Sequence, residues 1–415
     1  MKFWLWIWFW FWFWCWFGHE DGNPRTQSNG VRDSEFVRPF LLHRLLRANI
    51  GAAAAATTTT TVSRFRSSME VAGEPIRVQT LSQSGLTQVP PQYVQPPHHR
   101  PKASSPSPPQ TIPTVDLSGS GRDSVREAIG QACLDWGAFH VTGHGIPTDL
   151  LRAVKRVGLT FFNDCPVADK LRYACDPASS ASEGYGSRML ERDDTVLDWR
   201  DYFDHHTLPL SRRDPTRWPH FPEDYRRVVA EYADRAAALA RELLGLVSDS
   251  LGLPTRCVEE RVGEFYQNIT ISYYPPCPQP ELTLGLQAHS DMGAVTLLVQ
   301  DEVGGLEVLK DGEWVGVKSL DEDAIVVLLA DQTEIITNGK YKSAQHRAVT
   351  NSSRARLSVA TFHDPTKTVK ISPASQLISE SVPPRFREVV YGDYVSSWYT
   401  KGPEGKRNID ALLLD

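Results

Sequence analysis

From residue 265 to residue 365 the chain is divided into short runs of β-branched and aromatic residues, separated by turn residues. Such runs predict strands of about 4–8 residues rather than helices. The pairs Asp311-Gly312 and Asn338-Gly339 are of the type that favours tight β-hairpin turns. We therefore expect an antiparallel sheet or barrel here. The predicted strands lie within residues 268–274, 295–301, 306–317, 323–330, 334–344, 346–351 and 356–365.

Helical patterns precede this region. A long amphipathic helix is predicted from about Tyr225 to Leu251, and Gly252 follows it as a terminating residue. Further upstream, residues 138–147 are typical of a strand that runs into a turn. Helices first and an antiparallel barrel afterwards indicate an α+β architecture.

A possible metal site lies within the β-rich part. His289 and Asp291 are two residues apart, so on an extended strand their side chains share one face and can bind the same ion. His346 must then approach from another strand. Two neutral imidazoles and one carboxylate form the ligand set of mononuclear non-haem iron(II) sites, which leaves the opposite positions of the metal open. No catalytic residue beyond this metal centre is predicted.

A second pair of residues follows the distal histidine. Arg356 and Ser358 are also two apart on a predicted strand, so both point to the same side of the sheet. A planar cation and a hydroxyl are suited to holding a carboxylate by charge-assisted hydrogen bonds. A metal triad beside a carboxylate clamp meets the needs of an oxygenase that consumes a keto-diacid.

Longer stretches around these motifs resemble the plant 2-oxoglutarate- and iron(II)-dependent dioxygenases, such as jasmonate oxidases, anthocyanidin synthases and flavonol synthases. The resemblance spans roughly residues 112–400 and is carried by residues 112–119, 132–147, 271–320 and 331–365. It implies a double-stranded β-helix, or jelly roll, with a helical and mixed N-terminal region. It also implies Fe(II), with 2-oxoglutarate and dioxygen as co-substrates and ascorbate as reductant.

The resemblance assigns further residues to the site. Tyr274 matches the tyrosine of the family's Asn-x-Tyr motif, whose hydroxyl reaches the far carboxylate of 2-oxoglutarate together with Arg356 and Ser358. Here the first position of that motif is Ser272 rather than asparagine. Matching positions in the flavonoid enzymes line the substrate site, although a lysine stands there in place of Thr270. The substrate residues nominated in this way are Tyr185, Thr270, Phe362 and Asp364.

The resemblance implies hydroxylation, desaturation or demethylation of a small plant metabolite, with succinate and carbon dioxide as co-products. The sequence does not choose between a flavonoid or other phenolic substrate and a jasmonate-like acid. One alternative is a catalytically silent jelly-roll protein that only binds small molecules. Another is a zinc hydrolase with the same ligands, which would need a positioned general base and has no use for an Arg-x-Ser clamp.

The first 68 residues differ from the rest. Tryptophan occupies every even position from Trp4 to Trp16, and arginines, poly-Ala and poly-Thr follow. The apolar run is too short to span a bilayer comfortably. We favour a working protein that starts at Met69 and acts in the cytoplasm. The alternative is a genuine targeting segment that directs the protein to an organelle.

The composition of the chain adds little to the prediction of its partners. The net charge of −6 gives no hint of a nucleic-acid partner, and six cysteines without a C-x-x-C pair are expected to be free thiols. We expect a monomer that binds a small molecule, with no membrane or nucleic-acid partner. The predicted segments are 1–68 (atypical terminus), 69–111 (family N-terminal segment and Pro-rich linker), 112–225 (N-terminal dioxygenase region), 226–264 (long helix), 265–365 (jelly roll) and 366–415 (C-terminal segment).

Overall fold

The computed structural model describes residues 70–71, 74–75, 77–101, 111–119, 121–175, 183–187, 196–401 and 407–414. All of them belong to one compact unit, Arg66–Asp415. The atypical segment 1–68 lies outside the described residues, so our interpretation of it stays a prediction.

Two sheets form the centre of this unit. Neighbouring strands are antiparallel except for β3 and β4, which run parallel. The larger, eight-stranded sheet has the order β3 (Thr114–Asp116), β4 (Ala138–Thr142), β12 (Ile325–Leu329), β9 (Val295–Gln300), β14 (Arg356–Asp364), β7 (Tyr266–Tyr274), β6 (Asp201–Leu208), β5 (Gly184–Gly186). The smaller, four-stranded sheet has the order β11 (Glu313–Val317), β10 (Leu306–Lys310), β13 (His346–Ala348), β8 (Leu286–His289).

The larger sheet has a helix-covered face and an inner face. Side chains alternate along a strand, so residues of one parity share one face. Leu298, Val326 and Leu328 pack against Leu306 and Val308 of the smaller sheet, which defines the inner face between the two sheets. The two facing sheets, accompanied by helices, confirm the α+β prediction and the jelly-roll core.

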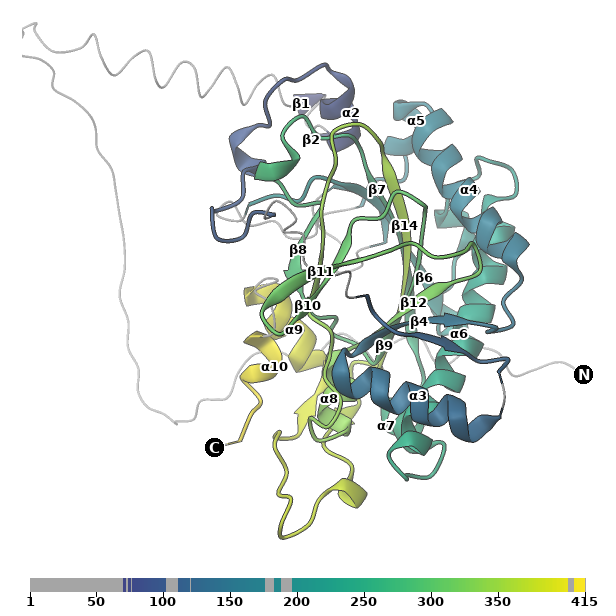
Figure 1. Ribbon diagram of the computed structural model, residues 1–415. Coiled ribbons are helices and arrows are strands. Elements are labelled where there is room, and N and C mark those ends of the chain that lie inside the picture. Colours follow the sequence, from purple (N-terminus) through teal and green to yellow (C-terminus); the bar gives the residue numbers. More distant parts are fainter. Residues whose placement is uncertain are drawn as a thin grey trace, which may run out of the picture. The chain divides into compact units, whose positions relative to one another are not determined.

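The outer face of the larger sheet is covered by helices. Figure 1 shows α4 (Thr148–Asp164) and α6 (Tyr225–Ser250) on the side of the sheet away from β8, β10 and β11. Both helices contact β14 and β9. In α6, apolar residues recur at helical spacing and are buried, as at Val229, Ala233 and Ala236. Burial of this stripe against the sheet fixes the long helix, and Gly252 follows it with a φ of 71°.

The remaining elements surround this core. Strands from both sides of the predicted boundary at residue 265 build the larger sheet, because β4 pairs with β12 and β6 pairs with β7. The further helices and strands are α2 (Val78–Gln83), α3 (Arg122–Asp135), α5 (Val167–Leu171), α7 (Cys257–Val262), α8 (Asp331–Ile336), α9 (Tyr391–Lys401), α10 (Arg407–Asp410), β1 (Glu70–Val71), β2 (Glu74–Pro75), β15 (Lys370–Ile371) and β16 (Val389–Val390).

Helix α2 is anchored to the start of β6. The backbone N–H groups of Val78 and Gln79 donate to the Asp201 carboxylate at 2.8 and 2.9 Å. A carboxylate at this position satisfies backbone donors that a helix leaves unpaired in its first turn. The N-terminal segment is thereby attached to the strand that begins with Asp201.

The helix predicted from about Tyr225 to Leu251 is confirmed as α6, and α7 follows it as a separate short helix within the segment 226–264. Two other predictions were wrong. The segment 334–344 is not a strand, because α8 occupies its beginning. Asn338 and Gly339 take up positive φ values just after α8 and end that helix instead of forming a hairpin. The prediction for Asp311-Gly312 is confirmed, since these two residues connect β10 and β11.

Two predictions about composition can also be compared with the described residues. No helix among the described residues is long and apolar enough to cross a membrane. Five cysteines are free thiols, as expected: Cys133, Cys165, Cys175, Cys257 and Cys277. Cys15 lies outside the described residues.

Candidate metal and co-substrate site

His289 and His346 lie directly opposite each other on β8 and β13. Their ring centroids are 4.3 Å apart, and both side chains are buried. Nδ1 of His289 lies 2.7 Å from the Gln287 carbonyl oxygen, and Nδ1 of His346 lies 3.0 Å from that of Ala344. When a neutral ring donates its Nδ1 proton to a carbonyl oxygen, its Nε2 atom carries the lone pair that can bind a metal.

Asp291 completes the group. Its Oδ1 atom lies 3.5 Å from His289 Nε2 and 3.7 Å from His346 Nε2. The three ligand atoms all lie within 4.8 Å of one another. The prediction that His346 approaches from a second strand is confirmed. The prediction that His289 and Asp291 share one strand was wrong, because β8 ends at His289 and Asp291 lies in the loop that follows.

Helix α8 holds this loop in place. The Asp331 N–H donates to the Asp291 carbonyl at 2.9 Å, and the Gln332 N–H donates to the Gly293 carbonyl at 2.8 Å. The Thr333 hydroxyl donates to the Ala294 carbonyl at 2.7 Å. The first turn of a helix has unpaired N–H groups that can bind a neighbouring backbone in this way. The element that we predicted as a strand therefore positions the metal-binding loop.

The protonation states suit a metal site. Burial alone would raise the pKa of Asp291, but His346 and His289 outweigh burial and lower the pKa of this carboxyl to about 2. Burial lowers the pKa of His346 to about 4. At neutral pH the site thus presents a carboxylate and a neutral imidazole, the forms that bind a divalent metal. Two imidazole nitrogens and one carboxylate oxygen on one side of a common point fit a facial iron(II) site.

The predicted carboxylate clamp lies on the inner face of the larger sheet, whereas His289 and His346 lie on the smaller sheet. Arg356 pairs with Tyr274 across β14 and β7, and Ser358 pairs with Ser272. The Arg356 guanidinium carbon lies 4.9 Å from the Tyr274 ring centroid, and Nη2 donates to Gln300 Oε1 at 3.2 Å. Nε and Nη1 of Arg356 are buried and have no hydrogen-bond partner within the described protein. Unsatisfied buried guanidinium donors are costly, so they indicate a place for an anionic ligand.

Three of the four nominated substrate residues share the inner face. Thr270 pairs with Ala360, and Phe362 pairs with Thr296, whose hydroxyl donates to Asp291 Oδ2 at 2.6 Å. Asp364 packs directly on the loop of the metal ligands. A Cβ atom added to Gly293 would lie only 1.9 Å from Asp364 Oδ1, so this close approach requires glycine.

Tyr185 is not part of this surface. It pairs with Phe203 and lies in the apolar core on the helix-covered face. Its ring centroid is 5.9 Å from that of Phe161, and its hydroxyl faces the Asp201 carboxylate at 3.4 Å. The substrate role predicted for Tyr185 was therefore wrong. Neighbouring strand positions alternate between faces, and motif matching alone did not reveal the face.

Acidic side chains lie near the substrate end of the inner face. The Asp204 carboxylate accepts a hydrogen bond from the Thr270 hydroxyl at 2.7 Å. Burial and then the charge of Asp291 raise the pKa of Asp364 to about 7, although a hydrogen bond with Tyr391 and the charge of Arg212 oppose this rise. The Arg212 guanidinium carbon lies 4.4 Å from the Tyr266 ring centroid. This end of the inner face therefore brings Asp204 and Asp364 near Arg212.

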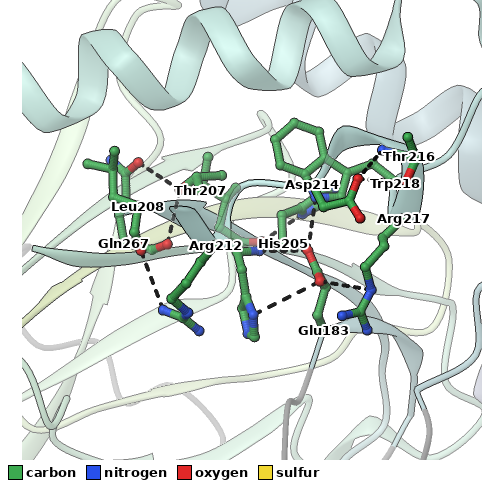
Figure 2. Close-up of polar contacts among 12 residues, drawn as sticks. Glu183, His205, Thr207, Leu208, Arg212, Asp214, Thr216, Arg217, Trp218 and Gln267 are labelled. Carbon is green, nitrogen blue, oxygen red and sulfur yellow. Dashed lines mark hydrogen bonds and ion pairs between the residues drawn. The ribbon is translucent and has the colours of Figure 1, made fainter. Parts of the chain in front are cut away.

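Glu183 belongs to a separate polar group. Figure 2 shows Arg217 and Trp218 converging on its carboxylate. Arg217 Nε lies 3.2 Å from Oε2, while Trp218 Nε1 and the His206 backbone N–H each donate to Oε1 at 3.0 Å. Because its oxygens are used in this way, we regard Glu183 as a structural acid rather than a contributor to substrate binding.

Comparisons with known proteins agree with this geometry. Residues 265–365 match the family model of the 2OG-Fe(II) oxygenase superfamily, and residues 112–221 match that of the non-haem dioxygenase in morphine synthesis N-terminal region. Jasmonate-induced oxygenase 1 of Arabidopsis thaliana is 37% identical, over 82% of this chain and 87% of the relative. The chain belongs to the 2OG-Fe(II) oxygenase superfamily.

Other members of the superfamily are similar over comparable lengths. Flavanone 3-dioxygenase 2 of Oryza sativa subsp. japonica is 38% identical, over 78% of this chain and 94% of the relative. The crystal structure of JOX2 in complex with 2OG, Fe and JA superposes with a TM-score of 0.76 at 36% identity. The match covers 82% of this chain and 99% of that one. The protein is thus a 2-oxoglutarate-dependent dioxygenase that uses Fe(II), as the resemblance implied.

Sequence reasoning about this dioxygenase missed helix α8, which holds the loop of Asp291, and it did not single out Arg200. Helix α8 was read as a strand because Ile335, Ile336 and Thr337 favour β structure. Asp331 and Glu334 in its first turn were the available helix signal. Arg200, which is buried and hydrogen-bonded to Ser272 at 3.1 Å, was passed over because no spacing connects it with Arg356.

Proposed function

We propose that His289, Asp291 and His346 hold the Fe(II) ion, and that Arg356, Ser358 and Tyr274 hold the far carboxylate of 2-oxoglutarate. Bound iron supplies the chemistry that couples dioxygen and 2-oxoglutarate to substrate oxidation, with succinate and carbon dioxide as co-products. The observation that carries this proposal is the pair of buried groups that the two sheets bring together. One is the His289, Asp291 and His346 triad of the smaller sheet and the loop after β8. The other is Arg356 on the inner face of the larger sheet, with two buried donors that have no partner among the described residues.

The protein's own residues prepare this site before ligands arrive. The carbonyl groups of Gln287 and Ala344 fix the two imidazole rings, and Thr296 fixes the carboxylate of Asp291. Such fixed orientation reduces the ordering that ligand binding requires. The apolar contact between the two sheets excludes water from the space between them.

The substrate is proposed to be a small plant metabolite that is hydroxylated, desaturated or demethylated. Of the two classes left open by the sequence, a phenolic substrate is better supported than a carboxylic acid. Asp204 and Asp364 can accept hydrogen bonds from phenolic hydroxyl groups, whereas a carboxylate substrate would meet these two acids on the inner face of the larger sheet. Arg212 offsets only part of this negative charge.

The experiment begins with an anaerobic titration of Fe(II) and then of 2-oxoglutarate into the full-length protein. A screen of phenolic and carboxylic-acid plant metabolites follows, with ascorbate present. Succinate formation and the mass of each substrate are measured together. Gain of an oxygen, loss of two hydrogens or loss of a methyl group identifies the type of reaction.

We expect succinate to form in step with oxidation of a phenolic compound. Asp364→Asn and Asp204→Asn should raise the KM for that compound by about tenfold, with little change in 2-oxoglutarate affinity. Coupled oxidation of carboxylic acids alone would refute the phenolic assignment. Ligand binding without succinate from any compound would favour the silent binding protein.

A further inference from the structure

Gln300 is the last residue of β9, and its side chain lies beside the proposed carboxylate clamp. It follows Leu298 by two positions and pairs with Ser358 on β14, so its side chain lies on the inner face of the larger sheet. Its Oε1 atom accepts a hydrogen bond of 3.2 Å from Nη2 of Arg356. Gln300 is 7% exposed and Arg356 is 3% exposed, so the amide and the guanidinium meet away from solvent.

The contact with Arg356 fixes which way the amide of Gln300 points. A guanidinium group donates hydrogen bonds and accepts none, so the amide atom that it contacts must be the oxygen. Turning the amide over would place two donors against each other. Nε2 of Gln300 is therefore the atom that faces away from this contact, and it carries two N–H groups that can donate to another acceptor.

Nε2 of Gln300 is buried and has no hydrogen-bond partner among the described residues. The same is true of Nε and Nη1 of Arg356. Proteins pair most buried donors, because an unpaired donor loses its hydration without compensation. Three unpaired donor atoms on two side chains that touch each other therefore indicate an acceptor that both side chains share and that comes from a ligand.

These donors lie close enough together for a single carboxylate. The oxygen and nitrogen atoms of an amide are about 2.3 Å apart, so Nε2 of Gln300 lies no more than about 5.5 Å from Nη2 of Arg356. Each oxygen of a carboxylate accepts hydrogen bonds at about 2.9 Å and has two lone pairs. One carboxylate can therefore reach the donors of both side chains.

An acid next to Gln300 does not satisfy these donors. Asp301 interacts electrostatically with Arg356. Its carboxylate, however, accepts the backbone N–H of Leu357 at 2.5 Å and that of Val303 at 3.0 Å. Asp301 therefore offsets part of the charge of Arg356 and leaves the donor atoms unpaired. The ligand must supply hydrogen-bond acceptors, whether or not the guanidinium charge is already compensated.

We infer that Gln300 is a further binding residue for the far carboxylate of 2-oxoglutarate, to which Nε2 donates while Oε1 orients the guanidinium of Arg356. This inference deepens the proposed function and rests on the co-substrate role of Arg356. Gln300 comes from the neighbouring strand β9, so neither the Arg-x-Ser motif nor Tyr274 includes it. Gln300 binds and orients the co-substrate and takes no part in proton transfer.

The test measures binding of 2-oxoglutarate and of oxalate to the full-length, Fe(II)-loaded protein by calorimetry without oxygen. Oxalate can bind the metal but has no far carboxylate. Gln300→Met removes both polar atoms of the amide at similar volume, and Gln300→Asn keeps an amide on a shorter side chain. Gln267→Met is the matched control, because Gln267 is a buried glutamine of the same sheet whose amide already pairs with Ala233 and Thr207. Iron content and melting temperature are determined in parallel.

We expect Gln300→Met to weaken 2-oxoglutarate binding by about 10- to 100-fold, because a hydrogen bond to a charged group is lost. Gln300→Asn should weaken it by about three- to tenfold, since the shorter side chain cannot reach both partners. Oxalate affinity and iron content should change less than about twofold, as should the 2-oxoglutarate Kd of Gln267→Met. If Gln300→Met does not fold, Gln300→Asn decides the question by the same comparison.

A double-mutant cycle separates direct contact from an effect that is transmitted through Arg356. Arg356→Lys lacks the guanidinium that Oε1 of Gln300 orients. In this background Gln300→Met should still weaken 2-oxoglutarate binding by about fivefold or more, because Nε2 contacts the carboxylate itself. Disappearance of the loss in the lysine background would show that Gln300 acts only by orienting Arg356, which would overturn the inference.

Two further results would overturn the inference. One is an unchanged 2-oxoglutarate Kd in a folded Gln300 variant, and the other is an equal loss for oxalate and 2-oxoglutarate. Failure of the proposed function is distinguishable, because Arg356→Ala would then leave 2-oxoglutarate binding unchanged. If only the role of Gln300 is wrong, Arg356→Ala still weakens 2-oxoglutarate binding.

Discussion

The Thr296 hydroxyl donates a hydrogen bond of 2.6 Å to Oδ2 of Asp291. Thr296 lies on β9, which pairs with β14 in the larger sheet. This contact leaves Oδ1 of Asp291 as the oxygen that faces both histidine Nε2 atoms. Groups that orient metal ligands in this way typically contribute 10- to 100-fold to metal affinity.

The first prediction follows from this contact. Thr296→Val removes the hydroxyl at nearly constant volume and should weaken Fe(II) binding by about 10- to 100-fold. Thr296→Ser keeps the donor and should stay close to wild type. Anaerobic iron titration followed by melting-temperature measurement checks both variants. Equal iron affinity in the valine and serine variants would contradict the orienting role.

The second prediction concerns the ligands themselves. His289→Ala, Asp291→Ala and His346→Ala should each abolish iron retention and succinate formation, because two remaining ligands cannot hold the ion. The fold should survive, since the sheet pairing does not depend on these side chains. Iron content, circular dichroism and turnover under metal-limited conditions are the measurements. Substrate oxidation that persists in any one variant would exclude that residue as a ligand.

The third prediction concerns Arg356. Arg356→Ala leaves the acid of the co-substrate without its partner, a loss on the order of 3–5 kcal/mol. The affinity for 2-oxoglutarate should fall on the order of a hundredfold to several thousandfold, with iron affinity little changed. Lysine should restore only part of the binding. A 2-oxoglutarate titration of all three proteins, with iron content measured in parallel, checks this. A normal Kd in the alanine variant would remove the basis of the proposed clamp.

The fourth prediction concerns pH. Burial lowers the pKa of His205 to about 4, and its ring contacts the Ile269 carbonyl and the Tyr225 hydroxyl. The unfolded chain binds a proton near pH 6.5, whereas the folded protein does so only near pH 4. Stability contributed by the neutral ring is therefore complete above pH 6.5 and is lost as pH falls toward 4, by up to ~1.4 kcal/mol per pH unit.

His205→Gln should reduce the pH dependence of the free energy of unfolding in that window. Chemical denaturation between pH 4.5 and 7.5, a range of about three pH units that covers the transition, measures the slope. His220→Gln is the control, because His220 is exposed. The same slope in wild type and His205→Gln would show that His205 titrates similarly in the folded and unfolded states.

The fifth prediction concerns the atypical N-terminus. All residues of the proposed site lie within the compact unit Arg66–Asp415. A protein that starts at Met69 should therefore equal the full-length chain in 2-oxoglutarate affinity and turnover, and we propose that it acts in the cytoplasm. Fluorescent fusions with and without residues 1–68 check the location in plant cells. Organelle import driven by residues 1–68 would reverse this proposal.

The grouping of His289, Asp291 and His346 could be predicted because this ligand set has few other uses. The shared face of Arg356 and Ser358 could be predicted because these residues are two apart on one strand. His289 and His346 needed only the assumption that two strands meet. Arg200 could not be found in this way, because its place beside Tyr274 depends on the register between β6 and β7. Register is a tertiary property that a single strand does not specify.

The error at α8 has a different cause. Local residue preferences over Ile335–Thr337 favour a strand, but backbone hydrogen bonds from the start of α8 to the loop of Asp291 favour a helix. Tertiary contacts outweighed local preference here. Tyr185 was misplaced because a motif match gives a position in the chain, and the pairing with Phe203 decides the face.

The attachment of α2 to Asp201 has a consequence for protein synthesis. Val78 and Gln79 leave the ribosome more than a hundred residues before the carboxylate that anchors them, with separations of 123 and 122 residues. A six-residue helix has little stability alone, so this segment stays unstructured until β6 has been translated. Because Arg356 and Ser358 lie on β14, 2-oxoglutarate can stabilise the proposed site only after β14 has been translated.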